Sequence, residues 1–124
     1  MNSIHRATVL IVDDTPDNLT LLSNLLKDKY HTKVATSGAT ALQIVASSRV
    51  DLILLDIMMP DMDGIETCKR LKADAASASI PVLFLTAKSL QEDETIGRSA
   101  GAVDFLRKPV NPDLLFARVA AHLK

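Results

Sequence analysis

Three short stretches of this chain consist only of apolar residues, and each is followed by polar residues. They are residues 9–12 (Val-Leu-Ile-Val), 52–55 (Leu-Ile-Leu-Leu) and 82–85 (Val-Leu-Phe-Leu). A strand without a polar position is typical of a parallel sheet, because helical crossovers cover both of its faces. The sequence therefore predicts three interior strands of a parallel sheet.

Two further stretches, residues 31–36 and 103–106, are more polar strand candidates. Polar side chains are better tolerated at the edges of a sheet, so we expect these two strands there. Between the strands, apolar residues recur with helical spacing, which predicts helices over 16–27, 39–46, 65–72, 90–100 and from 112 onward. Thr15 is suited to cap the first of these helices. In the last, the spacing predicts an apolar face made by Phe116, Val119, Ala120 and Leu123.

This alternation predicts the α/β class, with a doubly wound (βα)₅ arrangement of flavodoxin-like topology. Right-handed crossovers and three interior strands favour a five-stranded parallel sheet in the order 2-1-3-4-5. The chain has 124 residues without a linker or an internal repeat, so we expect residues 1–124 to form a single domain. In such sheets, ligands bind at the carboxyl ends of the strands, near the switch point between the first and third strands.

Composition excludes several classes of function. Lys and Arg total 14 against 15 Asp and Glu, so we expect no direct binding of nucleic acid. One cysteine, Cys68, excludes an intramolecular disulfide and a multi-cysteine zinc site. The apolar runs are far shorter than the roughly 20 residues that span a bilayer, and the polar residues 1–6 do not resemble a signal peptide. We therefore expect a cytoplasmic protein without membrane contact.

Polar residues follow the predicted strands where each one ends. They are Asp13 and Asp14 after the first, Asp56 after the third, Thr86 after the fourth and Lys108 after the fifth. At about 5 Å, two carboxylates repel by roughly 3 kcal/mol at an effective dielectric near 20, and a hard cation such as Mg²⁺ relieves this. A carboxylate nucleophile with a metal, an ammonium and a hydroxyl suits phosphoryl transfer.

Four motifs in this order resemble the signature of two-component response-regulator receiver domains, the CheY-like superfamily. The motifs are Val12-Asp13-Asp14, the segment from Asp56 to Gly64, Thr86-Ala87 and Lys108-Pro109. The resemblance extends from Thr8 to Leu123 and implies a phosphorylation-dependent signalling switch. Such a domain is not an enzyme in the usual sense, because it catalyses only its own phosphorylation and dephosphorylation.

The resemblance also implies a role for each site residue. Asp56 is the phosphoacceptor, and the donor is the phosphohistidine of a sensor histidine kinase or phosphotransfer protein. Mg²⁺ is bound directly by Asp14, Asp56 and the backbone carbonyl of Met58, and by Asp13 either directly or through water. Lys108 and Thr86 bind the phosphoryl oxygens.

A switch is implied through Thr86 and Phe105, whose ring we expect to rotate inward on phosphorylation. The readout surface is then the face formed by helix 90–100, strand 103–106 and the last helix, which can bind an effector domain or form a homodimer. Lys108-Pro109 is similar to the family's cis peptide. Met58 and Lys88 occupy positions where the family tunes dephosphorylation, so the phosphoryl lifetime stays open. Because Lys108 follows an edge strand, we expect Lys108→Ala to leave thermal stability nearly unchanged or raised.

Other interpretations remain at this point. Taken singly, Asp13 and Asp14 could cap a helix, Thr86 could simply end a strand, and Phe105 could be core. An alternative function is an aspartate-nucleophile phosphatase of the haloacid dehalogenase type. Its Asp-x-Asp pattern is missing at both candidate nucleophiles, because Thr15 stands two positions after Asp13 and Met58 two positions after Asp56. Another is a receiver-like binding module that is not phosphorylated. The sequence leaves open the cognate kinase, the output, the oligomeric state, and whether the receiver stands alone or is part of a larger regulator.

Overall fold

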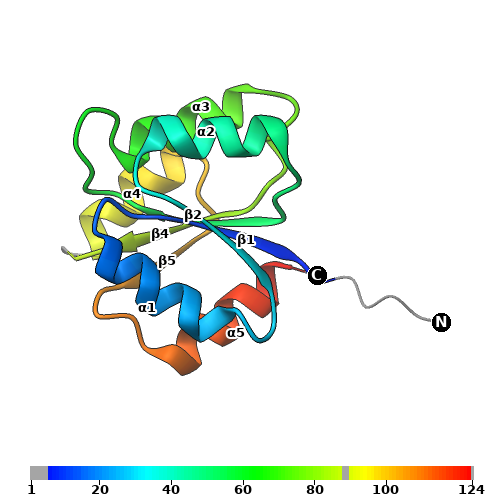
Figure 1. Ribbon diagram of the computed structural model, residues 1–124. Coiled ribbons are helices and arrows are strands. Elements are labelled where there is room, and N and C mark those ends of the chain that lie inside the picture. The colour runs from blue at the N-terminus through cyan, green and yellow to red at the C-terminus, as the bar shows by residue number, and fades with distance from the viewer. Residues whose placement is uncertain (1–5, 88–89, 124) are drawn as a thin grey trace.

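The computed structural model describes residues 6–87 and 90–123, in which strands and helices alternate along the chain (Figure 1). The elements are β1 (Thr8–Val12), α1 (Pro16–Leu26), β2 (His31–Ala35), α2 (Gly38–Ser47), β3 (Leu52–Asp56), α3 (Gly64–Ala73), β4 (Val82–Thr86), α4 (Leu90–Ala100), β5 (Asp104–Arg107) and α5 (Pro112–His122). The five strands form one sheet in the order β2-β1-β3-β4-β5, and every neighbouring pair is parallel. The predicted fold class, topology and strand order are confirmed.

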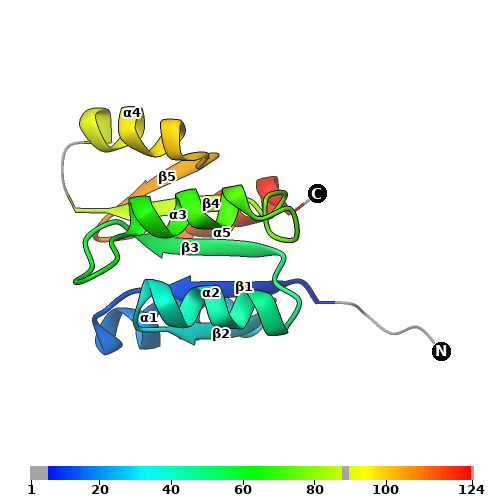
Figure 2. The ribbon, with the colours of Figure 1, turned by 90° about the horizontal axis from the view of Figure 1, so that it is seen from above.

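Both faces of the sheet are covered by helices (Figures 1 and 2). Helices α2, α3 and α4 lie on one face, and α1 and α5 lie on the other. Successive side chains of a strand point to opposite faces, so each strand contributes to two cores. In β4, Phe84 packs into the core beneath α2 to α4, whereas Leu83 and Leu85 pack into the core beneath α1 and α5. This two-sided burial explains why the interior strands are apolar between Thr8, which begins β1, and the polar residues at the carboxyl ends.

Polar side chains cap the amino-terminal ends of three of the helices. Ser37, Asp63 and Asn111 each accept a hydrogen bond from a backbone N–H in the first turn of the helix that follows. Thr15 occupies the same position before α1, but its side chain makes no such bond. Instead its own N–H donates to Asp13 Oδ1 at 2.9 Å. The prediction that the Thr15 side chain caps α1 is therefore wrong. The Asn18 N–H, which such a cap would bind, donates instead to the backbone carbonyl of Thr15 at 3.1 Å.

Helix α5 buries part of the face that spacing predicts: Val119 is buried, and Phe116 and Leu123 pack partly buried against the core. Leu115 and Val119 are fully buried, while Ala120 is exposed and Phe116 is half-buried. The Phe116 ring lies at the border of the core, where the Lys29 ammonium sits 4.7 Å from its centroid. The buried stripe is shifted toward Leu115. Ala120 is therefore left in solvent, and the Phe116 ring lies partly exposed at the edge of the core. Across the described ranges, no helix has both the length and the apolar character needed to cross a membrane.

Candidate functional site

Three carboxylates meet at the carboxyl edge of the sheet. Asp13 and Asp14 follow β1, Asp56 ends β3, and one oxygen from each lies within 4.8 Å of the others. Asp13 and Asp56 are buried, with 0% and 4% of their surface exposed, whereas Asp14 is exposed to solvent. The structure thus brings together the acidic residues that the sequence singled out.

Asp56 is held in an environment that disfavours its charge. Burial, and then the negative charge of Asp13, raise the pKa of Asp56 from 3.8 to about 6, although Lys108 opposes this shift. Its Oδ1 atom lies 3.2 Å from Lys108 Nζ and accepts a hydrogen bond from the Met58 N–H at 3.3 Å. Asp56 is therefore a buried, mostly ionised carboxylate at neutral pH.

Lys108 bridges two of the carboxylates. Its Nζ atom donates to Asp13 Oδ2 at 2.9 Å and lies 3.2 Å from Asp56 Oδ1. Burial alone would lower the pKa of Lys108, but hydrogen bonding to Asp13 and the charges of both carboxylates outweigh it and raise the pKa. The side chain stays a cation in contact with the acidic cluster. The peptide bond between Lys108 and Pro109 is cis, as the family resemblance implied.

Asp13 is held by two residues that sequence reasoning missed. Besides Lys108, the Thr15 N–H donates to Oδ1, and Asn18 Nδ2 donates to Oδ2 at 3.2 Å. Asn18 lies in the first turn of α1, five positions after Asp13, which itself follows β1. A polar amide so near the predicted acidic residues was the signal available in the sequence.

Thr86 is the last residue of β4 and is buried. It lies at the carboxyl edge of the sheet, the edge that also carries the acidic cluster. Its carbonyl oxygen accepts a hydrogen bond from the Lys108 N–H at 2.7 Å. Since side chains alternate along a strand, Thr86 shares a face with Phe84, the face covered by α3 and α4. The backbone thus joins the end of β4 directly to the residue that carries the ammonium.

The loop after β3 returns tightly to the strand end. A Cβ atom on Gly64 would lie 2.2 Å from the carbonyl oxygen of Asp56 and 2.8 Å from Ile57 Cα. Asp61 in the same loop has a φ angle of 65°. Gly64 therefore sets how closely the loop approaches Asp56, a role that the sequence pattern alone did not assign. The Met58 side chain is 54% exposed, so only its backbone faces this site.

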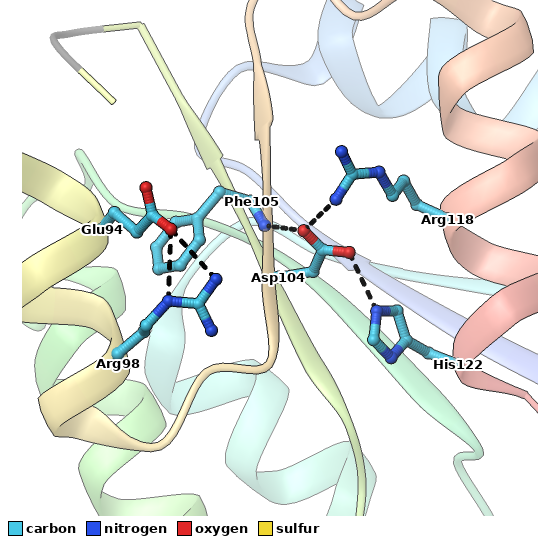
Figure 3. A network of polar contacts seen from close by, with 6 residues as sticks. All are labelled: Glu94, Arg98, Asp104, Phe105, Arg118 and His122. Carbon is cyan, nitrogen blue, oxygen red and sulfur yellow. Dashed lines mark hydrogen bonds and ion pairs between the residues drawn. The ribbon is translucent and has the colours of Figure 1, made fainter. Parts of the chain in front are cut away.

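Phe105 is already inside the protein. It is 8% exposed, and its ring centroid lies 5.9 Å from that of Phe84. A Cβ atom on Gly97 would come within 2.5 Å of the ring, so α4 rests directly on it. The Arg98 guanidinium covers the ring at 5.4 Å from its centroid and pairs with Glu94 (Figure 3). An inward rotation of this ring is thus not needed to bury it, contrary to what the sequence led us to expect.

Asp104 forms a second polar cluster on the opposite face of β5, one that sequence reasoning missed (Figure 3). Its Oδ1 atom accepts from the Phe105 N–H at 2.8 Å and from Arg118, and its Oδ2 atom lies 2.9 Å from His122 Nε2. Burial would raise the pKa of Asp104, but the hydrogen bonds from Arg118, His122 and Phe105 prevail and lower it. This cluster fastens α5 to β5. The signal was weak, because the three side chains lie up to 18 positions apart in the sequence.

The donor set of the acidic cluster suits a hard cation. Carboxylate oxygens from Asp13, Asp14 and Asp56 converge, and the Met58 side chain in the adjoining loop is exposed to solvent. Mg²⁺ prefers such oxygen ligands and keeps several waters, which the exposed side of Asp14 permits. The residues present therefore fit this metal.

A separate cavity of about 750 Å³ lies at the opposite, amino-terminal edge of the sheet. Two of the basic residues that line it have partners within the protein: Arg49 pairs with Asp51, and Lys72 donates to the carbonyls of Ala78 and Ile80. These two cations bind groups in the loops that lead into β3 and β4. The carboxylates of the candidate site do not line this cavity. Lys88 lies outside the described residues.

Residues 9–120 match the family model of the response regulator receiver domain. The chain belongs to this family. It is a receiver domain of two-component signalling, which works by phosphorylation, and receiver domains bind Mg²⁺ in their acidic pocket. The match favours the signalling switch over the phosphatase alternative.

Relatives and solved structures agree with the family. A probable cyclic di-GMP phosphodiesterase of Vibrio cholerae serotype O1 is 47% identical over 124 residues, which are 100% of this chain and 28% of that protein. The chemotaxis protein CheY4 of Vibrio cholerae has a TM-score of 0.91 and 32% identity, covering 96% of this chain and all (100%) of that one. The receiver domain of the sensor histidine kinase PA1611 of Pseudomonas aeruginosa, solved with a magnesium ion in its active-site cleft, has a TM-score of 0.88 and 28% identity over 96% of this chain and 98% of that one. The chain spans between about a quarter and about half of the length of the curated relatives it matches.

Proposed function

We propose that Asp56 accepts a phosphoryl group from a phosphohistidine and that this changes the surface of the domain. One observation carries the proposal: a buried carboxylate with a pKa of about 6 lies 3.2 Å from a lysine ammonium, within a cluster of three acids. A pKa of about 6 leaves roughly nine-tenths of Asp56 ionised at pH 7, so the nucleophile is available. A raised pKa means that the folded state disfavours the charged form of Asp56. These surroundings therefore do not suit an Asp56 whose role is to stabilise the fold.

The transfer forms one bond and breaks one. A carboxylate oxygen of Asp56 attacks the phosphorus, the P–N bond to the donor histidine breaks, and its electron pair returns to the imidazole ring. The product is an acyl phosphate on Asp56. Hydrolysis of that acyl phosphate by water would return the carboxylate and release inorganic phosphate.

Asp13, Asp14, Asp56 and the backbone carbonyl of Met58 are the groups that would hold Mg²⁺. When bound, the cation supplies positive charge against the clustered carboxylates and the phosphoryl oxygens. Lys108 adds a second positive charge, and we expect its ammonium to leave Asp56 for a phosphoryl oxygen. Thr86 would donate its hydroxyl to another phosphoryl oxygen from the end of β4.

The readout would use the surface of α4, β5 and α5. Thr86 lies on the same face of β4 as Phe84, whose ring meets that of Phe105. Gly97 brings α4 onto the Phe105 ring, so a shift of Thr86 toward the phosphoryl group would be felt by α4 through these rings. The buried ring makes a displacement of α4 the expected change, in place of an inward rotation.

The partners follow from the proposed chemistry. The phosphodonor would be a sensor histidine kinase or a phosphotransfer protein, and the α4-β5-α5 surface would contact an effector domain or a second copy of the chain. The relative from Vibrio cholerae is named for a phosphodiesterase activity, so an effector of that kind elsewhere in the protein is one candidate output. The single-domain assignment of residues 1–124, the cytoplasmic location and the absence of direct nucleic-acid binding stay predictions.

The test is phosphorylation with a small donor. Incubation with acetyl phosphate and Mg²⁺ should add the mass of one phosphoryl group, and a chelator should prevent it. Asp56→Asn should remove the labelling, whereas the control Asp61→Asn should keep it, because Asn is well suited to the positive φ of that loop position. Undiminished labelling of Asp56→Asn at another residue would contradict the proposal.

A further inference from the structure

Asp13 is the most enclosed acid of the site and accepts hydrogen bonds from three donors. Thr15 N–H binds Oδ1 at 2.9 Å, while Lys108 Nζ at 2.9 Å and Asn18 Nδ2 at 3.2 Å both bind Oδ2. An ionised carboxylate can only accept, so the nitrogen of the Asn18 amide is the atom that must face it. The orientation of Asn18 is thereby defined.

The position of the Asp13 carboxylate depends on these three donors. Its negative charge raises the pKa of Asp56, which means that the two groups repel each other. The Thr15 N–H restrains one oxygen only, so the position of Oδ2 depends on Lys108 and Asn18. Lys108 is shared with Asp56 at 3.2 Å and, in the proposed function, turns to the phosphoryl group. When Lys108 turns to the phosphoryl group, Asn18 is the one of these two side chains that still donates to Asp13 Oδ2.

We propose that Asn18 is a positioning residue for the metal site: its amide holds Asp13 in the orientation that presents a carboxylate oxygen beside Asp14 and Asp56. The inference rests on the proposed role of Asp13 toward Mg²⁺. Asn18 is half-buried in the first turn of α1, where the helix backbone fixes its reach. It therefore keeps its place whether or not Lys108 contacts Asp13.

The first test is the Mg²⁺ affinity of the unphosphorylated protein, measured by isothermal titration calorimetry. Asn18→Leu keeps a similar volume but removes the donor, and we expect affinity to fall about tenfold, as is typical for a group that orients a metal ligand. Asn24→Leu places the same substitution on an exposed position of α1 and should leave affinity unchanged. Asn18→Gln retains an amide and should recover part of the loss. Thermal unfolding without Mg²⁺ separates this effect from a general loss of helix stability.

The second test combines Asn18→Leu with Lys108→Met. If Asn18 substitutes for Lys108 as the donor to Oδ2, the loss of Mg²⁺ affinity caused by Asn18→Leu should be larger in the Lys108→Met background than in the unsubstituted protein. An equal fold-change in the two backgrounds, or equal Mg²⁺ affinity of Asn18→Leu and the unsubstituted protein, would overturn the inference alone. Absence of Mg²⁺ binding by the unsubstituted protein would overturn the metal part of the proposed function together with this inference.

Discussion

The Lys108 ammonium lies closer to Asp13 than to the proposed phosphoacceptor: Nζ is 2.9 Å from Asp13 Oδ2 and 3.2 Å from Asp56 Oδ1. Before any phosphoryl group arrives, this cation neutralises a carboxylate with no exposed surface. Lys108 thus has two tasks, one for the resting site and one for the proposed transfer. Its removal is expected to affect both.

Lys108→Ala should lower the free energy of unfolding at pH 7 by about 1–3 kcal/mol, because two buried carboxylates lose their counter-charge. The sequence alone predicted nearly unchanged or raised stability, and the ion pair with buried Asp13 reverses our expectation. Added Mg²⁺ should restore part of the loss by replacing the charge. Urea denaturation with and without Mg²⁺ measures this, with the exposed Lys69→Ala as control. Equal stability of Lys108→Ala and the unsubstituted protein in the absence of Mg²⁺ would contradict the expected resting role.

Asp56→Asn should stabilise the domain at neutral pH while removing the proposed phosphorylation. The folded-state pKa of Asp56, about 6, exceeds its ordinary value of 3.8, so the folded state binds the proton more tightly than the unfolded chain does. Ionisation therefore costs stability as pH rises from 3.8 to 6, and an uncharged Asn avoids a cost of about 1–3 kcal/mol. Urea denaturation at pH 7.5 should show this gain, and the gain should shrink at pH 4. A gain that is the same at both pH values would contradict the assigned cause.

The sequence predicted the sheet because its strands are buried on both faces. The apolar runs that begin at Val9, Leu52 and Val82 can be buried on both faces only as interior strands of the sheet. Because the strands are parallel, the polar residues that follow them meet at one edge. The acidic cluster could be predicted for the same reason, since the carboxyl ends of parallel strands are brought together by topology.

The contacts that depend on side-chain reach could not be predicted in this way. Asn18 binds Asp13 from a helix turn, and Gly64 matters because a loop of unknown path returns to Asp56. Asp104 pairs with Arg118 and His122, whose spacing on α5 carries no signal until the helix is placed against β5. The burial of Phe105 likewise depends on Gly97, because only the docking of α4 decides what covers the ring.

Asp104→Asn should loosen α5. The pKa of Asp104 is lowered in the folded state, so its contribution to stability is present above its ordinary value of 3.8 and is lost as pH falls through the folded-state pKa. At pH 7 we expect a loss of about 1–2 kcal/mol, small because the Arg118 side chain is 42% exposed and its ion pair is screened. Hydrogen exchange of the amides in α5 should increase more than in α1. The control is Asp28→Asn at an exposed position, and the stability difference between the two variants should shrink as pH falls below 3.8.

Thr86→Ala should uncouple the acidic site from α4. Beryllofluoride with Mg²⁺ imitates the acyl phosphate, and its binding to the unsubstituted domain should shift the backbone amide signals from Glu94 to Phe105. We expect this because Thr86 shares a face with Phe84, Phe84 meets the Phe105 ring at 5.9 Å, and α4 rests on that ring at Gly97. Thr86→Ala lacks the hydroxyl that would follow the phosphoryl group.

The variant should therefore still bind the mimic, with shifts at Asp14 and Met58, but lose most of the shifts in α4 and β5. Thr86→Ser keeps the hydroxyl and serves as the matched control, so its distant shifts should persist. A second readout is the Phe105 ring itself, whose proton signals should move with those of Gly97 in the unsubstituted domain and in Thr86→Ser. Shifts of the same size in α4 and β5 of Thr86→Ala would contradict this prediction. The Phe84–Phe105 contact would then respond without the Thr86 hydroxyl, so the signal would reach α4 by another route.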